Sequence, residues 1–315
     1  MSTATVLKLH GAAGTGQAAP AREGAAPAAP LPGPLPASRA AEAPARPWAA
    51  LLARGPSGRA MALGVLSIAA FLVAWHLAST YRLDAFIRFI NVPGPLVVLD
   101  RLAHALDNPS FVQNVLISLR RIMLGFCLAA LVGVPLGLVM GRFRVVRECV
   151  FPLSEALRPI PAIAWVPMSI MLWPTTEASI VFITFLGSFF PILVNTLHGM
   201  HALDGVLVRA ARCLGASERQ LFLEVYLPGT LPQIFTGLTV GMGVAWVSLI
   251  AAEMISGQFG IGYFTWEAYS LIQYADIVLG MVCIGVLGLL SSAVIRMIGG
   301  LVMPWARGSA VQEGR

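Results

Sequence analysis

The chain contains long runs of apolar residues that are almost free of charge. The clearest run extends from Met61 to Thr80 and holds no Asp, Glu, Lys or Arg. About 20 such residues are enough for an α-helix to cross the hydrocarbon layer of a membrane. Of all residues 57% are hydrophobic and 11% are charged, whereas a soluble domain carries about 25% charged residues. The sequence therefore predicts an all-α, polytopic membrane protein.

Six segments have the composition of membrane spans. The third contains Pro159, Pro161 and Pro167 and is short. Broken helices persist in a membrane only when they are buried in protein or line a cavity, so this span is expected beside a cavity, although prolines also occur in purely structural kinks. The expected spans are residues 61–80, 122–140, 159–173, 178–197, 234–255 and 277–298.

Composition also divides the chain along its length. Residues 1–56 are rich in Ala, Pro and Gly and hold no aromatic residue before Trp48. Such a segment buries too little apolar area to offset its ordering entropy, so we expect a disordered cytoplasmic tail. A transit peptide is the alternative reading of its Arg and Ala content. Residues 57–307 then form the transmembrane domain, with a core of about 114–303, and 308–315 form a C-terminal tail.

Small residues recur every fourth position in two of the expected spans. The second span has Gly133, Gly137 and Gly141 in such a series, and the fifth has Gly237 and Gly241. A stripe of small residues lets a second helix approach closely. These stripes are therefore expected to pack against other helices of the chain, and the alternative is that they line a path across the membrane.

The sequence offers no catalytic, nucleotide-binding or metal-binding motif. Its one lysine is Lys8, so it lacks the P-loop, whose lysine reaches the nucleotide phosphates. His198 and His201 have no third ligand at a familiar spacing and are expected at the membrane interface. The arginines are spread along the chain, not clustered as nucleic-acid binding requires. We expect no metal and no cofactor, and we interpret the four cysteines as small hydrophobic residues: Cys127, Cys149, Cys213 and Cys283.

One carboxylate falls inside an expected span. Glu253 lies near the end of the fifth span. Carboxylates inside membranes are costly and usually face the bundle interior or water. Two readings stay open, a functional role within the membrane and a position that simply reaches the interface.

The longest polar break in the second half of the chain runs from residue 209 to 232. Apolar residues recur at helical spacing over 206–214, and Gly215 is suited to end that helix. Ser217 is a plausible N-cap for a second helix, which Pro228 and Pro232 are expected to end. The sequence thus predicts a basic, amphipathic helix–turn–helix between two spans.

This break resembles the loop that marks the membrane subunits of ABC importers. Three further stretches resemble the nitrate, sulfonate and taurine branch of these permeases: SLRRIMLGF at 118–126, LRPIPAIAWVP at 157–167 and GLTVGMGVAWVSLIAAEM at 237–254. The resemblance covers roughly residues 61–303. Arg209 stands where many members have Glu. The matching positions in the loop are Ala210, Ala211, Gly215, Ala216, Ser217, Leu227 and Pro228.

The resemblance implies an architecture and a set of partners. It implies a permease like those of type I ABC importers, in the bacterial inner membrane, with two ATPase subunits at the cytoplasmic face. It also implies an external substrate-binding protein and a second permease subunit, expected to be another copy of this chain. Loop 204–228 would couple the permease to the ATPase. The translocation path is expected to involve Pro161, Trp165, Trp246 and Glu253.

The resemblance carries less information about the substrate. The stretch GIGYFTWEAYS at 260–270, followed by Asp276, resembles members that handle nitrate, nitrite or cyanate. Sulfonate, taurine or another small organic solute is the alternative. Arg120 and Arg158 are candidates to attract an anion, and a membrane-flanking role explains them equally well.

The basic residues predict the orientation. With the N-terminus inside, 16 Lys and Arg residues fall on the inner side and five on the outer side. An excess of Lys and Arg in cytoplasmic loops is the usual rule, so both termini and the 204–228 loop are expected in the cytoplasm. A secondary transporter or channel is the main rival class, but it needs charged coupling groups within its spans. An intramembrane enzyme lacks any supporting motif.

Overall fold

The computed structural model describes residues 58–81 and 91–307, and its secondary structure over these residues is helical throughout. The expected tails, 1–56 and 308–315, lie outside the described residues. The helical elements are α2 Gly58–Thr80, α3 Pro95–Leu106, α4 Pro109–Arg142, α5 Arg144–Leu157, η2 Ala162–Trp165, α6 Val166–Leu172, α7 Thr176–His201, α8 Gly205–Cys213, α9 Glu218–Gln220, η3 Leu221–Tyr226, α10 Leu227–Ser256, α11 Ile261–Ser270, α12 Tyr274–Val302 and η4 Pro304–Arg307.

Five helical stretches of the described chain are long and apolar enough to cross a membrane. They contain α2, α4, α7, α10 and α12, and they coincide with five of the six expected spans. The second begins earlier than expected, at Pro109 instead of residue 122. Asn108 caps this helix, since its side chain accepts a hydrogen bond from Ser110 N at 3.0 Å. Arg120 and Arg121 therefore lie inside α4 and do not mark its start.

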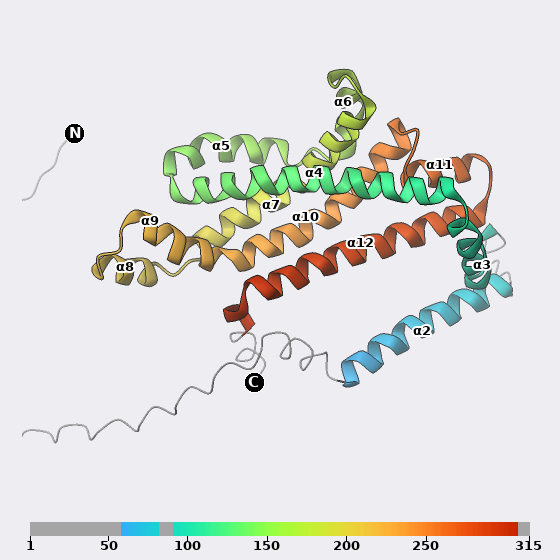
Figure 1. Cartoon of the computed structure of the whole chain (residues 1–315), viewed down its shortest axis with the longest axis horizontal. Helices are drawn as coiled ribbons and strands as arrows, with labels where there is room; N and C mark the ends of the chain where they lie inside the picture. The colour runs from blue at the N-terminus through green and yellow to red at the C-terminus, as the bar shows by residue number, and fades with distance from the viewer. Residues whose placement is uncertain (1–57, 82–90, 308–315) are drawn as a thin grey trace, which may run out of the picture. The chain divides into compact units, whose positions relative to one another are not determined.

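The third expected span is not one helix. Residues 159–173 form a turn, the η2 turn and the short helix α6, because Pro159 and Pro161 cannot donate backbone hydrogen bonds inside a helix. Helices α4 and α7 run parallel, since Gly125 lies against Thr184 and Gly137 against Thr196. The chain between them must therefore run back along their length. Figure 1 shows α5 and α6 making this return, so the return is built from short helices and begins at α5.

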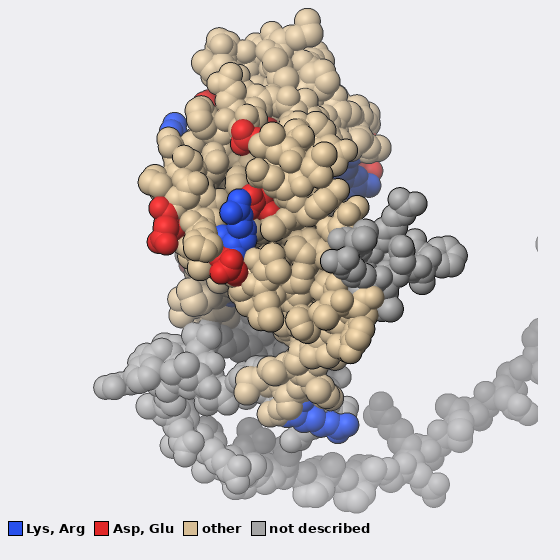
Figure 2. Space-filling model, turned by 90° about the vertical axis from the view of Figure 1, so that its right-hand side faces the viewer, with Lys and Arg blue, Asp and Glu red and all other residues tan. Residues whose placement is uncertain are grey.

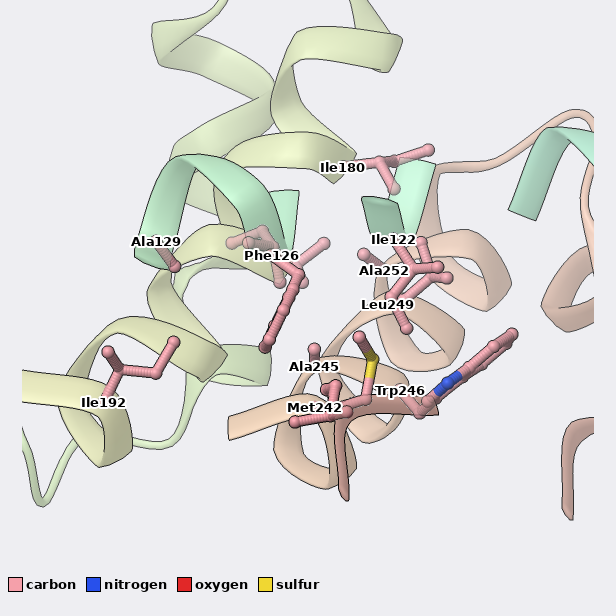
Figure 3. Packing of buried hydrophobic residues seen from close by; sticks show 13 residues of the cluster. Ile122, Phe126, Ala129, Ile180, Ile192, Met242, Ala245, Trp246, Leu249 and Ala252 are labelled. Carbon is pink, nitrogen blue, oxygen red and sulfur yellow. The ribbon is translucent and has the colours of Figure 1, made fainter. Parts of the chain in front are cut away.

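Helix α7 lies at the centre of the hydrophobic core. It packs against α4 on one side and against α10 on the other, and Figure 3 shows side chains from all three helices pointing toward one another. Ile180, Ile183 and Ile192 of α7 are fully buried. Helices α7 and α10 run antiparallel, because Asn195 of α7 lies against Gly237 of α10 while the earlier Gly187 lies against the later Ser248. The outer helices, in contrast, expose their apolar side chains, as a lipid environment requires.

The close approach of α4 and α7 gives a first prediction. A Cβ added to Gly137 would lie 2.7 Å from Thr196 Cβ and 3.0 Å from Leu193 O. Gly137→Ala is therefore expected to lower the free energy of unfolding by about 1–3 kcal/mol, seen as a lower melting temperature in detergent. Gly243→Ala is the control, because nothing lies within 4 Å of that position. It should be neutral or gain up to about 1 kcal/mol, and equal melting of both variants would contradict the packing.

The expected helix end at Pro228 and Pro232 is wrong. The chain continues without a break from Glu218 to Ser256. Residues Leu221–Tyr226 form a widened π-helical turn directly before Pro228, which lies in the first turn of α10. A proline in the first turn of a helix costs little, because no hydrogen bond of that helix needs its missing N–H. Pro232 lies inside α10, which continues past it. The polar loop and the fifth span are therefore one mechanical unit.

Few charged side chains appear at the end of the molecule that carries α3 and α11. Figure 2 looks at this end and shows a few charged residues, several of them next to a residue of opposite charge, among uncharged ones. One pair there joins two distant elements, since Arg101 of α3 donates to Asp276 of α12 at 2.6 and 2.8 Å. The hydrogen bonds and charge of Asp276 raise the pKa of Arg101. Helix α3 is thereby held to the start of α12.

Candidate functional site

A cavity of about 530 Å³ opens between the α5–α6 connection, α7 and α10. Its walls are mostly apolar, with Val194 and Phe190 from α7 and Val244 and Val247 from α10. These residues belong to the middle of their helices, so the cavity lies at mid-height in the bundle. The volume falls within the range of sites that hold small molecules.

Three polar side chains interrupt the apolar lining. They are Arg158 at the end of α5, Asn195 of α7 and Ser248 of α10. Arg158 is the one ionisable residue among those that line the cavity. It forms an ion pair of 3.3 Å with Glu155, one turn earlier in α5, and its side chain is 49% exposed. The cavity therefore has one positive group that is incompletely neutralised.

The four residues expected on the path lie in different surroundings. Pro161 lines the cavity, directly before the η2 turn. Trp165 is partly buried against the main core. Trp246 points away toward α12, where its Nε1 donates to Ser291 Oγ at 2.9 Å. Neither tryptophan is among the residues that line the cavity.

Glu253 is fully buried in a network of hydrogen bonds. It accepts from Arg121 Nη1 at 2.9 Å, from Ser118 Oγ at 2.8 Å and from Gly262 N at 3.0 Å. Its side chain is 0% exposed and that of Arg121 is 2% exposed. A buried charge needs a partner and hydrogen bonds to be tolerated, and Glu253 has both. This carboxylate joins α10 to α4 instead of facing the cavity.

The same network fixes the turn between α10 and α11. Gly260 has a φ of 118°, a conformation that side chains rarely adopt, and a Cβ at this position would collide with the carboxylate of Glu253. Arg121 also donates to Phe259 O at 2.6 Å and to Glu177 of α7. Arg121 does not stand out in the sequence, because a charged pair beside an apolar run resembles a membrane flank. The clue in the sequence was Glu253, because a carboxylate inside an apolar span needs a positively charged partner.

The helix–turn–helix lies at the opposite end of the bundle, after α7 (Figure 1). Asp204 caps α8 by accepting from Val206 N at 2.8 Å. After α8, Gly215 has a φ of 83°, which a glycine adopts without strain. Ser217 then caps α9 in a capping box with Gln220. The turn is therefore set by local rules that the sequence shows directly.

Two arginines tie this element together and to the bundle. Arg212 pairs with Glu218 at 3.2 Å, and Arg142 at the end of α4 also pairs with Glu218. Helix α8 has no buried residue, and its apolar Val206 and Leu207 are exposed. We call residues 204–228 the elbow. Apolar side chains without cover in the described part of the chain are typical of a surface that docks a protein.

The residues that matched the family loop are distributed along the elbow. Arg209 and Ala210 lie on the exposed side of α8, whereas Ala211 is half-buried. Ala211 O accepts from Ala216 N at 3.1 Å, and Arg212 O accepts from Gly215 N at 3.0 Å. These two bonds form the helix stop that a glycine at this position permits. Leu227 and Pro228 lie at the start of α10, so the elbow ends in the fifth span.

A family model matches more than half of the chain. Residues 133–308 match the model described as "Binding-protein-dependent transport system inner membrane component". This range contains α5 to α12, and with them the cavity and the elbow.

Several curated proteins are similar over most of their length. A putative ABC transporter permease of Methanocaldococcus jannaschii is 38% identical over 241 residues, which is 75% of this chain and 89% of that protein. The nitrate import permease protein NrtB of Synechocystis is 32% identical, covering 76% of this chain and 88% of its own. The taurine transport system permease protein TauC of Escherichia coli is 32% identical, covering 80% and 92%.

Proposed function

This chain belongs to the family of binding-protein-dependent transport system inner membrane components, and from that premise we propose how it works as an ABC importer permease. We propose that the cavity beside α7 and α10 is part of the path of a small anion. The elbow would receive the motion of a separate ATPase. The observation that carries the proposal is the elbow itself, an exposed helix pair whose second helix, α9, is continuous with a helix that lines the cavity.

Mechanical coupling follows from this continuity. The stretch Glu218–Ser256 runs unbroken from α9 to the far end of α10, and its Val240 to Ala251 region lines the cavity. A displacement of the elbow would therefore move one wall of the cavity without bending a loop. The ATPase biases a two-state element in this way, and substrate-loaded binding protein biases the same element from the other side.

Two relatives support the proposal that the substrate is a small oxyanion or a sulfonate. Both the nitrate permease of Synechocystis and the taurine permease of E. coli are similar to this chain at 32% identity. We propose nitrate, nitrite or cyanate, because residues 260–270 and Asp276 resemble the members that handle these ions. Taurine or another sulfonate is the alternative.

Competition during uptake tests the choice of substrate. Cells that carry the chain with its ATPase and binding protein should accumulate nitrate in an ATP-dependent manner. A tenfold excess of nitrite or cyanate is expected to reduce nitrate uptake by more than half, and the same excess of taurine to leave it unchanged. If taurine is accumulated instead and nitrate does not compete, the chain serves the sulfonate branch.

We propose two ATPase subunits and a second copy of this chain as partners, with an external binding protein. Large apolar side chains along α2, α4 and α12 are exposed, which leaves room for both lipid and a second permease subunit. Cross-linking of the membrane-embedded complex should give a permease pair. A complex that always holds one copy of this chain with a different permease would show a heterodimer.

The orientation gives a further prediction. We propose that both termini and the elbow are in the cytoplasm of a bacterial cell, as the excess of inner arginines favours. A reporter fused after Gly215 is therefore expected to be active only if it functions in the cytoplasm. A periplasm-specific reporter, fused at the same residue, should stay inactive, and activity of that fusion would contradict the orientation.

A secondary transporter or channel is the competing class. Such proteins carry their own coupling groups, usually ionisable residues exposed to the path. In the described part of this chain the buried ionisable residues do not line the cavity, since Arg121 and Glu253 pair with each other and Asp276 pairs with Arg101. The ionisable residue that does line the cavity, Arg158, is paired with Glu155. Transport by this chain should consequently depend on an external source of motion.

A further inference from the structure

The sequence leaves two roles open for Arg158, attracting an anion and flanking the membrane. Arg158 follows an amphipathic helix that begins directly after the end of α4, where a flanking arginine is expected. The structure instead places it on the wall of the cavity, together with Pro191 and Asn195 from the middle of α7. An arginine at mid-height in a bundle is costly and usually faces a water-filled cavity or marks the route of an ion.

The chemistry of the cavity suits an anion that is held weakly. The guanidinium group has five N–H donors, and its contact with Glu155 is one ion pair of 3.3 Å. Donors therefore remain for a ligand in the cavity. Asn195 uses one amide hydrogen for Pro191 O at 2.8 Å, so its second is free for a ligand, and the Ser248 hydroxyl is a further donor.

We propose that Arg158 forms a low-affinity binding site for small oxyanions in this cavity, and that Glu155 competes with the anion for the guanidinium group. This inference rests on the proposed function where it takes the ligand to be the transported solute. A planar guanidinium binds an oxyanion through two parallel hydrogen bonds. An internal carboxylate keeps this binding from becoming too tight, and conduction requires that an ion also leaves its site.

The competing explanation is that Arg158 and Glu155 form only a structural ion pair at the end of α5. The two explanations predict different results for the two partners. If the pair is only structural, removing either charge has the same effect. If Arg158 holds the anion, Arg158→Gln weakens anion binding and Glu155→Gln strengthens it, because the competing carboxylate is gone.

The first experiment measures the electrostatic preference of the cavity without any transport. Val194, which lines the cavity, is changed to cysteine in a full-length background without native cysteines. Membranes containing the chain and its partners are treated with an anionic or a cationic methanethiosulfonate reagent. With Arg158 present the anionic reagent should react faster. Arg158→Gln should lower the anionic-to-cationic rate ratio by about tenfold, the size expected for one nearby charge, and Glu155→Gln should raise it.

Arg144→Gln is the matched control. Arg144 lies in the same helix and is paired with Glu148 at 2.6 Å, as Arg158 is with Glu155, but its side chain is 82% exposed and does not line the cavity. This variant should keep the rate ratio of the parent. Arg158→Lys should keep most of it, since the charge remains although the planar fork is lost. Equal ratios in the Arg158→Gln variant and the parent would overturn the proposal.

The second experiment measures nitrate uptake with the complete importer. Arg158→Gln is expected to raise the nitrate KM by about tenfold, while Glu155→Gln lowers it and Arg144→Gln leaves it unchanged. The two experiments distinguish a failure of the anion site from a failure of the proposed function. A parent that takes up no anion, with a rate ratio that still depends on Arg158, removes the proposed substrate class but keeps the anion site. Uptake by the parent with no dependence on Arg158 removes the site and keeps the proposed function.

Discussion

Glu253→Ala is expected to lower the free energy of unfolding by about 3–5 kcal/mol, the size observed when one partner of a buried ion pair is removed. The variant leaves the Arg121 guanidinium, which is 2% exposed, without its buried partner. It also removes the acceptor of Ser118 and of Gly262 N. Thermal unfolding of the purified chain in detergent measures the effect.

Glu177→Ala is the matched control for this prediction. Glu177 is also a glutamate paired with Arg121, but its side chain is 52% exposed, and an exposed ion pair is worth about 0–1 kcal/mol. If Glu253→Ala does not accumulate in the membrane, the double variant Arg121→Met with Glu253→Met provides the test. Replacing both charges by apolar groups of similar size often restores stability. A Glu253→Ala variant as stable as Glu177→Ala would contradict the network.

Gly215→Pro is expected to separate ATP hydrolysis from uptake. The φ of Gly215 is 83°, whereas proline is fixed near −65°, and proline also lacks the N–H that bonds Arg212 O. The turn of the elbow cannot form, so motion of the ATPase no longer reaches α10. Solute uptake should fall by at least about tenfold, while the amount of chain in the membrane stays the same and ATP is still hydrolysed. Ala211→Asp, on the half-buried side of α8, should have the same effect.

Two substitutions distinguish the shape of the turn from a general disturbance of the elbow. Gly215→Asn should keep most of the uptake, because asparagine tolerates positive φ. Gly205→Ala should be close to wild type, since a Cβ there meets only the end of the flexible Arg209 side chain at 3.2 Å. Wild-type uptake by Gly215→Pro would show that the elbow does not couple.

The sequence predicted the features that depend on local rules. The apolar length of the spans, the cap at Ser217 and the glycine stop at residue 215 follow from a few neighbouring residues. The all-helical membrane fold follows from these local features, and the family follows from the motifs. The match over residues 133–308 confirms the family.

The sequence could not predict the features that depend on distant partners. Arg121 resembled a membrane flank because nothing near it in the chain shows that Glu253 lies 2.9 Å away. For Arg158 the sequence left two roles open, attracting an anion and flanking the membrane, because its position depends on the return of the chain through α5. The prediction that Pro228 ends a helix was wrong for another reason, since a π-helical turn precedes the proline and the helix continues.

The central claim is that this permease moves its solute only when a separate ATPase acts on the elbow. Uptake into proteoliposomes tests it most directly, with the chain reconstituted alone and together with the ATPase that purifies with it. We predict uptake only when the ATPase, ATP and loaded binding protein are all present. Uptake of the same solute at a comparable rate by the chain alone, without ATP, would contradict the account.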